Sequence, residues 1–203
     1  MWEKEKYYRQ GLIKKLKLTF IIFFFYLLLI NVSNANLQEK IISKLQEVKT
    51  LSFNFTQKIA EKEEKGNCYI KYPLLMRCNY QNAKQKILIS NGKTVAVIKK
   101  KYKKIYYYPI KITPLFTILN KEKILNLIKY SKPIKNGLKV IMFEFNDKQS
   151  NNLKIFFDKN SLEFKGWETK DAYSNNVIFT ISDLKTNKTI EDKFFKIPKE
   201  EDL

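Results

Sequence analysis

The middle of the chain alternates apolar and polar residues in a pattern that predicts a β-hairpin. In GNCYIKYPLLMRCNY, residues 66–80, Pro73 stands at the centre, and folding the chain back there places Cys68 opposite Cys78. Side chains on a strand alternate between two faces, and a one-residue slip would mix apolar and polar residues, so the pattern supports this register. One face then carries Cys68, Ile70, Tyr72, Leu74, Met76, Cys78 and Tyr80. The other carries Asn67, Tyr69, Lys71, Leu75, Arg77 and Asn79. We therefore expect a hairpin with one dry face and one wet face.

The segment before the hairpin changes from a helical to an extended period. Apolar residues recur at helical spacing over residues 36–48, which predicts an amphipathic helix. Leu51, Phe53 and Phe55 then alternate with polar residues, which predicts a half-buried strand over residues 51–59. The charged run AEKEEK, residues 60–65, is interpreted as a connection into the hairpin.

After the hairpin, Asn91 and Gly92 lie between two β-rich runs, the strongest short turn signal in the chain. A turn at these two residues pairs Leu88 with Val95. Both faces of these runs are apolar, so the pattern leaves the inward face open. One more strand is predicted over residues 103–108, before Pro109.

The next segment predicts two helices. Thr113 is suited to cap a helix, and Pro114 is suited to its first turn. Leu115, Ile118 and Leu119 fall on one face, so we expect a short amphipathic helix over the sheet. A second helix is predicted over residues 122–130, and strands follow at 138–146, 153–158, 163–170, 177–182 and 194–197. The fold class is therefore mainly β with helices (α+β), in one domain.

The first 35 residues have the pattern of a cleavable signal peptide. A basic front precedes the apolar run Leu18–Ile30, and Ser33 and Ala35 offer small residues at cleavage-site spacing. We expect a cut between Ala35 and Asn36 and an exported domain over residues 36–203. The alternative is a membrane anchor, but the run is shorter than the roughly 20 residues that a bilayer span needs.

The two cysteines both lie in the exported part. In an oxidising compartment Cys68 and Cys78 can form a cross-strand disulfide, which would contribute about 2–3 kcal/mol by closing a short loop. The alternative is two buried free thiols that pack as small apolar residues. The sequence leaves both open.

The formal charge is +19, of which the signal peptide carries +4. Such a surplus attracts nucleic acid or anionic lipid. We expect no nucleic-acid partner, because export separates the chain from most nucleic acid and nearly all its basic residues are lysines. The densest run, KKKYKK at residues 99–104, is read as a solvated loop or a strand edge protected by charge. The alternative is a docking patch for an acidic partner or a membrane surface.

The sequence carries little catalytic equipment. It has no histidine, which excludes histidine triads and histidine-ligated metals. Two cysteines in one hairpin do not make a zinc cluster, and no glycine-rich phosphate loop occurs. Together with 15 Phe and 12 Tyr, this inventory favours a binding module over an enzyme, without metal or cofactor.

The order of these segments resembles the LolA family of periplasmic outer-membrane lipoprotein carriers. The matching stretches, spread over residues 37–198, are LSFNFTQKI, GNCYIKYPLLMRCNY, ILISNGKTV, YYYPIKITPLFTIL, KGWETKD and KFFKIP. The resemblance implies a curved, incompletely closed antiparallel β-barrel with a helical lid over an apolar cavity for acyl chains. It implies acylated lipoproteins as cargo, an inner-membrane ABC lipoprotein-release complex as donor and an outer-membrane acceptor. We expect the carrier to be a monomer.

The resemblance also assigns cavity residues. From the sheet they are Leu51, Phe53, Phe55, Ile70, Met76, Leu88, Val95 and Val97, and from the lid they are Leu115, Ile118 and Leu119. For each of these residues the alternative is ordinary core packing. Some members carry an arginine just before the hairpin proline, associated with lid closure and cargo handover, where this chain has Tyr72. The handover step and the acceptor are therefore left open. The competing function is a periplasmic binder of another amphiphile, a free lipid or glycolipid, or a lipid-sensing domain of the same fold.

Overall fold

The computed structural model describes residues 37–136, 139–145, 152–171 and 173–203. The predicted signal peptide, residues 1–35, lies outside the described residues. The chain divides into two units, Met1–Lys40 and Ile41–Leu203, and every described strand belongs to the second.

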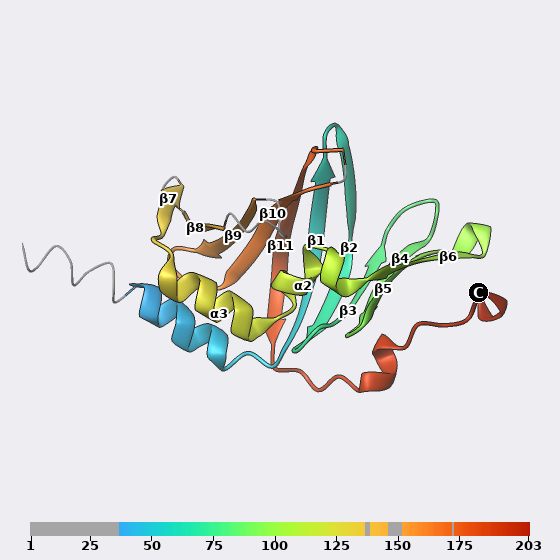
Figure 1. Ribbon diagram of the computed structural model, residues 1–203, viewed down its shortest axis with the longest axis horizontal. Helices are drawn as coiled ribbons and strands as arrows, with labels where there is room; N and C mark the ends of the chain where they lie inside the picture. The colour runs from blue at the N-terminus through green and yellow to red at the C-terminus, as the bar shows by residue number, and fades with distance from the viewer. Residues whose placement is uncertain (1–36, 137–138, 146–151, 172) are drawn as a thin grey trace, which may run out of the picture. The chain divides into compact units, whose positions relative to one another are not determined.

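Within the described residues, eleven strands form one antiparallel sheet in the order β6-β5-β4-β3-β2-β1-β11-β10-β9-β8-β7 (Figure 1). The long strands β1 and β11 pair at its centre, which joins the early and late parts of the chain. Strands β6 and β7 are the two edges, so the sheet is open, as predicted. The strands are β1 (Thr50–Ile59), β2 (Lys62–Lys71), β3 (Leu75–Tyr80), β4 (Lys86–Asn91), β5 (Thr94–Lys99), β6 (Lys104–Pro109), β7 (Ile134–Asn136), β8 (Val140–Phe145), β9 (Leu153–Asp158), β10 (Phe164–Lys170) and β11 (Asn176–Thr186).

Helices cover one face of this sheet, which we call the inner face and which carries Leu51, Phe53 and Phe55. A first helix spans residues 37–46, and α2 (Leu115–Ile118) and α3 (Lys121–Tyr130) follow the sixth strand. In Figure 1, α2 and α3 lie in front of the sheet. Four 3₁₀ turns complete the described elements: η1 (Lys100–Tyr102), η2 (Ile110–Ile112), η3 (Asp192–Phe195) and η4 (Glu200–Asp202).

The predicted hairpin is confirmed with its register. Strands β2 and β3 pair Cys68 with Cys78 and Ile70 with Met76. The two cysteines form a disulfide, which decides between the two alternatives that the sequence left open. The interpretation of residues 60–65 as a connection was wrong, because β2 already begins at Lys62 and pairs with the end of β1. The polar side chains of residues 60–65 are compatible with a pair of strands that extends into solvent.

Removing the disulfide is expected to lower the stability of the hairpin. A Cys68→Ala/Cys78→Ala variant should lose roughly 2–3 kcal/mol in urea unfolding, because the bond closes a loop with a sequence separation of 10 and so restricts the unfolded chain. A reductant should lower the melting temperature of the parent protein and leave that of the variant unchanged. Equal responses of the two proteins to reductant would contradict this role.

The pairing of β4 with β5 differs from the prediction by two residues, because the turn lies one residue later. Leu88 pairs with Val97, and Val95 pairs with Ser90. The reason is local: the Asn91 side-chain oxygen accepts hydrogen bonds from the backbone N–H groups of Lys93 and Thr94, and Gly92 has a φ of +94°. The two-residue turn is therefore Gly92–Lys93. Because a shift of two residues preserves the faces, Leu88, Val95 and Val97 still share the inner face.

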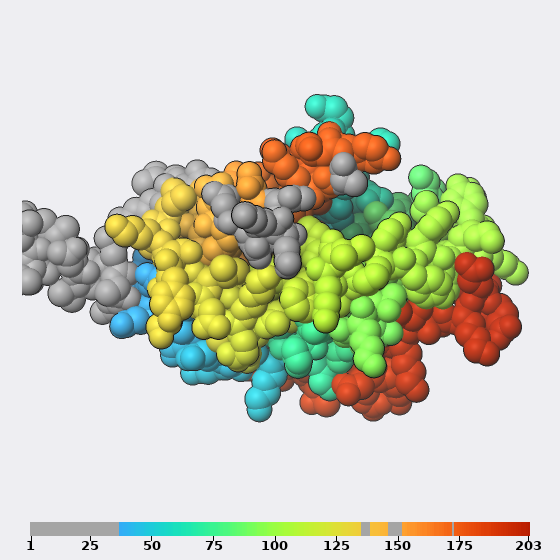
Figure 2. Space-filling model, in the orientation of Figure 1, coloured from blue at the N-terminus to red at the C-terminus, as the bar shows by residue number. Residues whose placement is uncertain are grey.

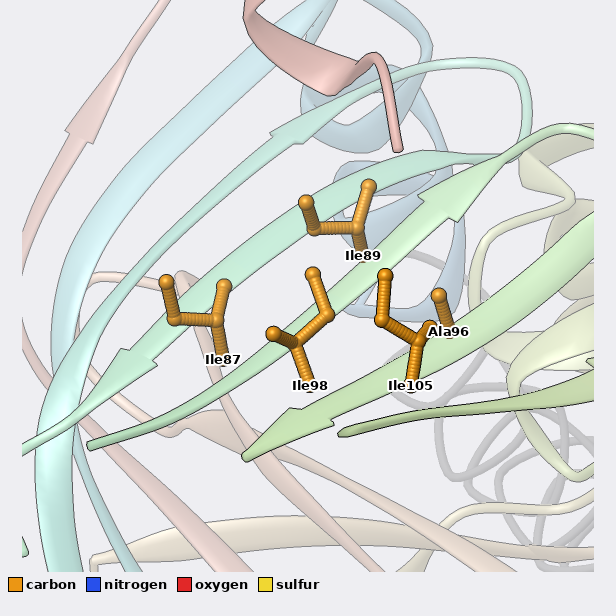
Figure 3. Close-up of a cluster of buried hydrophobic side chains, with 5 residues drawn as sticks. All are labelled: Ile87, Ile89, Ala96, Ile98 and Ile105. Atoms are coloured by element: carbon orange, nitrogen blue, oxygen red, sulfur yellow. The ribbon is translucent and has the colours of Figure 1, made fainter. Parts of the chain in front are cut away.

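The opposite, outer face of β4–β6 is dry as well, contrary to a sheet with one wet face. A cluster of five buried side chains lies there (Figure 3), and Ile197 and Leu203 pack against it. These two residues belong to the C-terminal strap, residues 187–203. The predicted strand at 194–197 was wrong, because this segment forms η3 and then crosses the outer face without joining the sheet. The cluster consists of Ile87, Ile89, Ala96, Ile98 and Ile105.

The strap is anchored on the hairpin by aromatic and cationic contacts. The Phe194 ring meets Tyr69 edge-on at 5.0 Å between centroids, and the Arg77 guanidinium lies 5.0 Å from the same ring. Arg77 also donates to the Phe194 carbonyl at 3.2 Å. Lys71 donates to the Ile190 carbonyl and to Asp192. The outer face of the hairpin is thus occupied by the protein's own C-terminal segment.

Candidate functional site

The register of the sheet places all eight predicted sheet residues on the inner face. Leu51 pairs with Ile70, which pairs with Met76, so these three form one row across β1, β2 and β3. A parallel row runs through Cys78, Leu88 and Val97 across β3, β4 and β5. The six residues Leu51, Phe53, Phe55, Ile70, Met76 and Val95 are buried, whereas Leu88 and Val97 are half-buried. The predicted set therefore splits into a covered part and a part that reaches the surface.

The predicted lid residues complete the covered part. Ile118 and Leu119 have no exposed surface, and Leu115 is half-buried. Thr113 does not cap this helix as predicted: its hydroxyl donates to the Ile110 carbonyl, and Pro114 stands at the N-cap without a side-chain bond. The capping side chain belongs to Asn120, which accepts from the Lys123 N–H at the start of α3. The single turn of α2 thus lies in the sequence between the 3₁₀ turn η2 and the helix α3, which is capped by Asn120.

Specific hydrogen bonds hold this lid against the sheet. The Leu74 N–H, at the tip of the central hairpin, donates to the Leu119 carbonyl at 2.9 Å. The Ser90 hydroxyl donates to the Leu74 carbonyl at 2.6 Å. The Lys121 ammonium donates to the carbonyls of Gln46 and Val48, at 2.8 and 3.0 Å, and so joins α3 to the end of the first helix. These hydrogen bonds oppose lid opening together with the apolar packing of Ile118 and Leu119.

Loosening one of these contacts is expected to shift the lid toward an open state. In a Lys121→Ala variant the two carbonyls lose their protein donor, which costs about 1 kcal/mol or slightly more. We expect faster amide hydrogen exchange in α2 and α3 with little change in β1 and β11. Lys129, exposed near the end of α3, offers a matched control, because Lys129→Ala removes the same charge from the same helix. The same increase in exchange in both variants would contradict a clamp at Lys121.

An aromatic row crosses the inner face and was largely missed by sequence reasoning. Phe55 meets Tyr80 edge-on at 4.9 Å between centroids and stacks on Phe179 at 4.6 Å. Phe179 stacks in turn on Trp167 at 4.0 Å. Alternation in the late strands could have identified Trp167 and Phe179 as inward-facing. The row continues through Phe164, Phe157 and Phe143.

Tyr72 lies at the hairpin tip, where the resemblance marks the handover position. Its backbone N–H donates to the Lys49 carbonyl, and its half-buried side chain lines a pocket of about 360 Å³ together with Pro73 and Lys121. Desolvation raises the pKa of the Tyr72 hydroxyl above its usual value. Arg77 lies on the outer face against the strap, so it does not take the place of an arginine at Tyr72.

The described residues contain no grouping of three or more metal-ligating side chains. No helix in the same residues is long and apolar enough to cross a bilayer. The inner face instead offers an apolar and aromatic surface under the lid. Such a surface can exclude water from a flexible hydrocarbon chain, and its apolar contacts do not depend on the orientation of the ligand.

Comparison with known proteins agrees with this architecture. No curated protein has significant sequence similarity to the chain. An uncharacterized conserved protein from Thermus thermophilus has the same fold, with a TM-score of 0.50 at 10% identity over 81% of this chain and 94% of that one. A LolA superfamily protein from Nitrosomonas europaea gives a TM-score of 0.41 at 8% identity, covering 78% and 97%. MucB of Pseudomonas aeruginosa, in its complex with MucA, gives 0.46 at 9% identity, covering 80% and 60%.

The family assignment comes from the sequence profile. The profile of the family described as "Outer membrane lipoprotein carrier protein LolA" matches residues 46–198, which is most of the chain. The match begins in the first helix and ends in the C-terminal strap, so it includes the central hairpin, the lid and all the long strands. The chain belongs to the LolA family.

Proposed function

We propose that this protein is a periplasmic carrier that shields the acyl chains of lipoproteins between the inner and outer membranes. The observation that carries the proposal is the family match over a sheet whose inner face is apolar and is closed by a lid. Each CH₂ group of an acyl chain exposed to water costs about 0.8 kcal/mol, so lipid does not cross an aqueous gap uncovered. A protein with this inner face offers the cover.

The lid must move for the carrier to load. Ile70, Met76 and Ile118 are fully covered or nearly so, with exposed fractions of 0, 1 and 0%. An acyl chain reaches them only by displacing α2 from the sheet. The side chains Leu88, Val97 and Leu115 are half-buried, so we assign them to the entrance and the buried set to the deeper part of the site. The contacts that the sheet loses with α2 are replaced by contacts with the acyl chain. The net affinity for the cargo is therefore moderate, and the cargo can be released.

The proposed cycle needs partners at both membranes. The chain has no glycine-rich phosphate loop, so an inner-membrane ABC lipoprotein-release complex would supply the energy for loading. An acceptor that holds the acyl chains more tightly would take the cargo at the outer membrane. Tyr72 in place of an arginine removes a positive charge from the hairpin tip, so we expect handover to rely on apolar displacement there.

Export through a cleaved signal peptide is part of the proposal. N-terminal sequencing of the protein from a periplasmic extract is expected to begin at Asn36. A protein that starts at Met1 and remains in the membrane fraction would contradict the carrier proposal and would indicate an anchored interaction protein.

The test of function is the identity of the bound cargo. The tagged, exported protein is isolated from the periplasm of its own bacterium, and everything that stays bound is identified by mass spectrometry. Triacylated proteins are the expected result. Free lipid or glycolipid alone would indicate a binder of another amphiphile, and an empty protein would indicate that the inner face is simply core.

A further inference from the structure

The strongest feature not used by the carrier proposal is the edge of the sheet at β6. From Lys93 to Lys111 the chain has seven lysines and no acidic residue. Five large apolar or aromatic side chains of this part of the chain are exposed. They are Tyr102 (51%), Tyr106 (44%), Tyr107 (55%), Tyr108 (45%) and Ile112 (72%). We call residues 99–112 the basic edge. It belongs to the light-green surface at the right of Figure 2.

The tyrosines of the basic edge project to both sides of the sheet. Tyr106 and Tyr108 pair with Val97 and Val95, so they extend the inner face, whereas Tyr107 pairs with Ala96 on the outer face. Lysines accompany them: Lys99 lies over the Tyr106 ring at 4.8 Å, and Lys101 lies over the Tyr102 ring at 6.0 Å. The edge is therefore a rim with aromatic groups on both sides and ammonium groups among them.

The backbone of this rim is blocked at two positions against pairing with another strand. The Ile105 N–H donates to the Glu200 carboxylate of the C-terminal strap at 2.9 Å, and Pro109 has no N–H to offer. Lysines along an edge strand also oppose strand addition. These features favour a partner that is recognised by the side chains.

We propose that the basic edge docks the protein on an anionic membrane surface. Lysines near a bilayer are attracted to anionic headgroups, and tyrosine rings favour the level of the headgroups. Lysine is depleted in the centre of protein–protein interfaces, so this composition fits a lipid surface better than a protein surface. The edge leads through η2 directly into α2, so docking would bring the lid close to the bilayer. The proposal does not depend on cargo binding.

Vesicle flotation of the purified protein tests the docking. We expect binding to vesicles of phosphatidylglycerol and phosphatidylethanolamine at low salt, none to phosphatidylcholine alone, and release by salt. A Lys100→Gln/Lys101→Gln/Lys104→Gln variant should bind about 100-fold more weakly, at about fivefold per lysine. The control is Lys62→Gln/Lys165→Gln/Lys170→Gln, which removes the same charge from exposed lysines elsewhere.

A second measurement locates the contact. A Tyr107→Trp variant should lose fluorescence on vesicles of brominated phosphatidylglycerol, whereas Tyr173→Trp, at a position that is 87% exposed outside the basic edge, should not. Equal weakening in the two lysine variants, equal quenching at both positions, or no binding to anionic vesicles would overturn the proposal. So would capture of an acidic protein through the same lysines without vesicle binding. Neither lysine variant changes a buried residue of the inner face, so cargo binding is measured as a separate result.

Discussion

A Leu88→Glu variant is expected to fold and to lose its lipid cargo. Leu88 is half-buried and, in the proposed carrier, lies at the entrance of the site, so a carboxylate there can turn toward water in the empty protein. When an acyl chain lies on β4 and β5, the same carboxylate is covered by hydrocarbon. An uncompensated buried charge costs about 3–5 kcal/mol, which corresponds to a loss of at least about 100-fold in affinity. Co-purified lipid or lipoprotein per protein is the quantity to measure.

Two further variants separate this effect from loss of fold. Lys86 and Lys99 form the next pair on the same face, and their ammonium groups could partly neutralise a carboxylate at position 88. They cannot neutralise an added ammonium group, so Leu88→Lys repeats the test with a charge that has no such partner. Ile178→Glu places the same charge at an apolar residue with 36% exposure on the outer face, and we expect it to keep its cargo. Normal cargo on a folded Leu88→Glu or Leu88→Lys protein would remove this position from the site.

The sequence predicted best what depends on local contacts. The central hairpin was placed with its register because Pro73 and the two cysteines mark its axis, and a slip would expose apolar residues. The turn lies one residue later than predicted, at Gly92–Lys93, which shifts the strand pairing by two residues. The Asn91 side chain accepts the bonds that a backbone carbonyl would otherwise accept. A shift of two residues preserves the faces, so Leu88 and Val97 lie on the same face as Cys78. The pattern of these runs had left the inward face open, and the assignment of both residues to the site stays a prediction.

Features that depend on distant contacts were not predictable in the same way. The strap was read as a strand because Phe194 and Phe195 stand in a β-like run, but these rings pack onto the outer face of strands that are far away in the sequence. The buried cluster on the outer face of β4 and β5 was not predictable for the same reason. These strands are apolar on both faces, so the sequence does not indicate which face the helices cover. One of the contacts that hold the lid is the backbone hydrogen bond from Leu74 to the Leu119 carbonyl, for which the sequence has no signal.

A Gly66→Ala variant is expected to have the largest effect on stability. Gly66 is buried in β2 between Phe55 of β1 and Tyr80 of β3, on the inner face. An added methyl group would overlap with the Asn79 carbonyl oxygen and would lie 2.8 Å from two atoms of the Phe55 ring. The ring is held by Tyr80 and Phe179, and the carbonyl belongs to the neighbouring strand, so neither can withdraw at low cost. We expect a loss of about 3 kcal/mol or more in urea unfolding.

The comparison with Gly92→Ala distinguishes this steric effect from backbone strain. At Gly92 the added methyl group would meet only a Leu75 side-chain atom at 3.9 Å, but the φ of +94° is unfavourable for alanine. That variant should lose only about 1–2 kcal/mol. A Phe55→Leu/Gly66→Ala double variant should recover part of the larger loss, because residues in contact are not additive and only the ring overlap is relieved. A Gly66→Ala protein as stable as Gly92→Ala would mean that β2 can move away from β3.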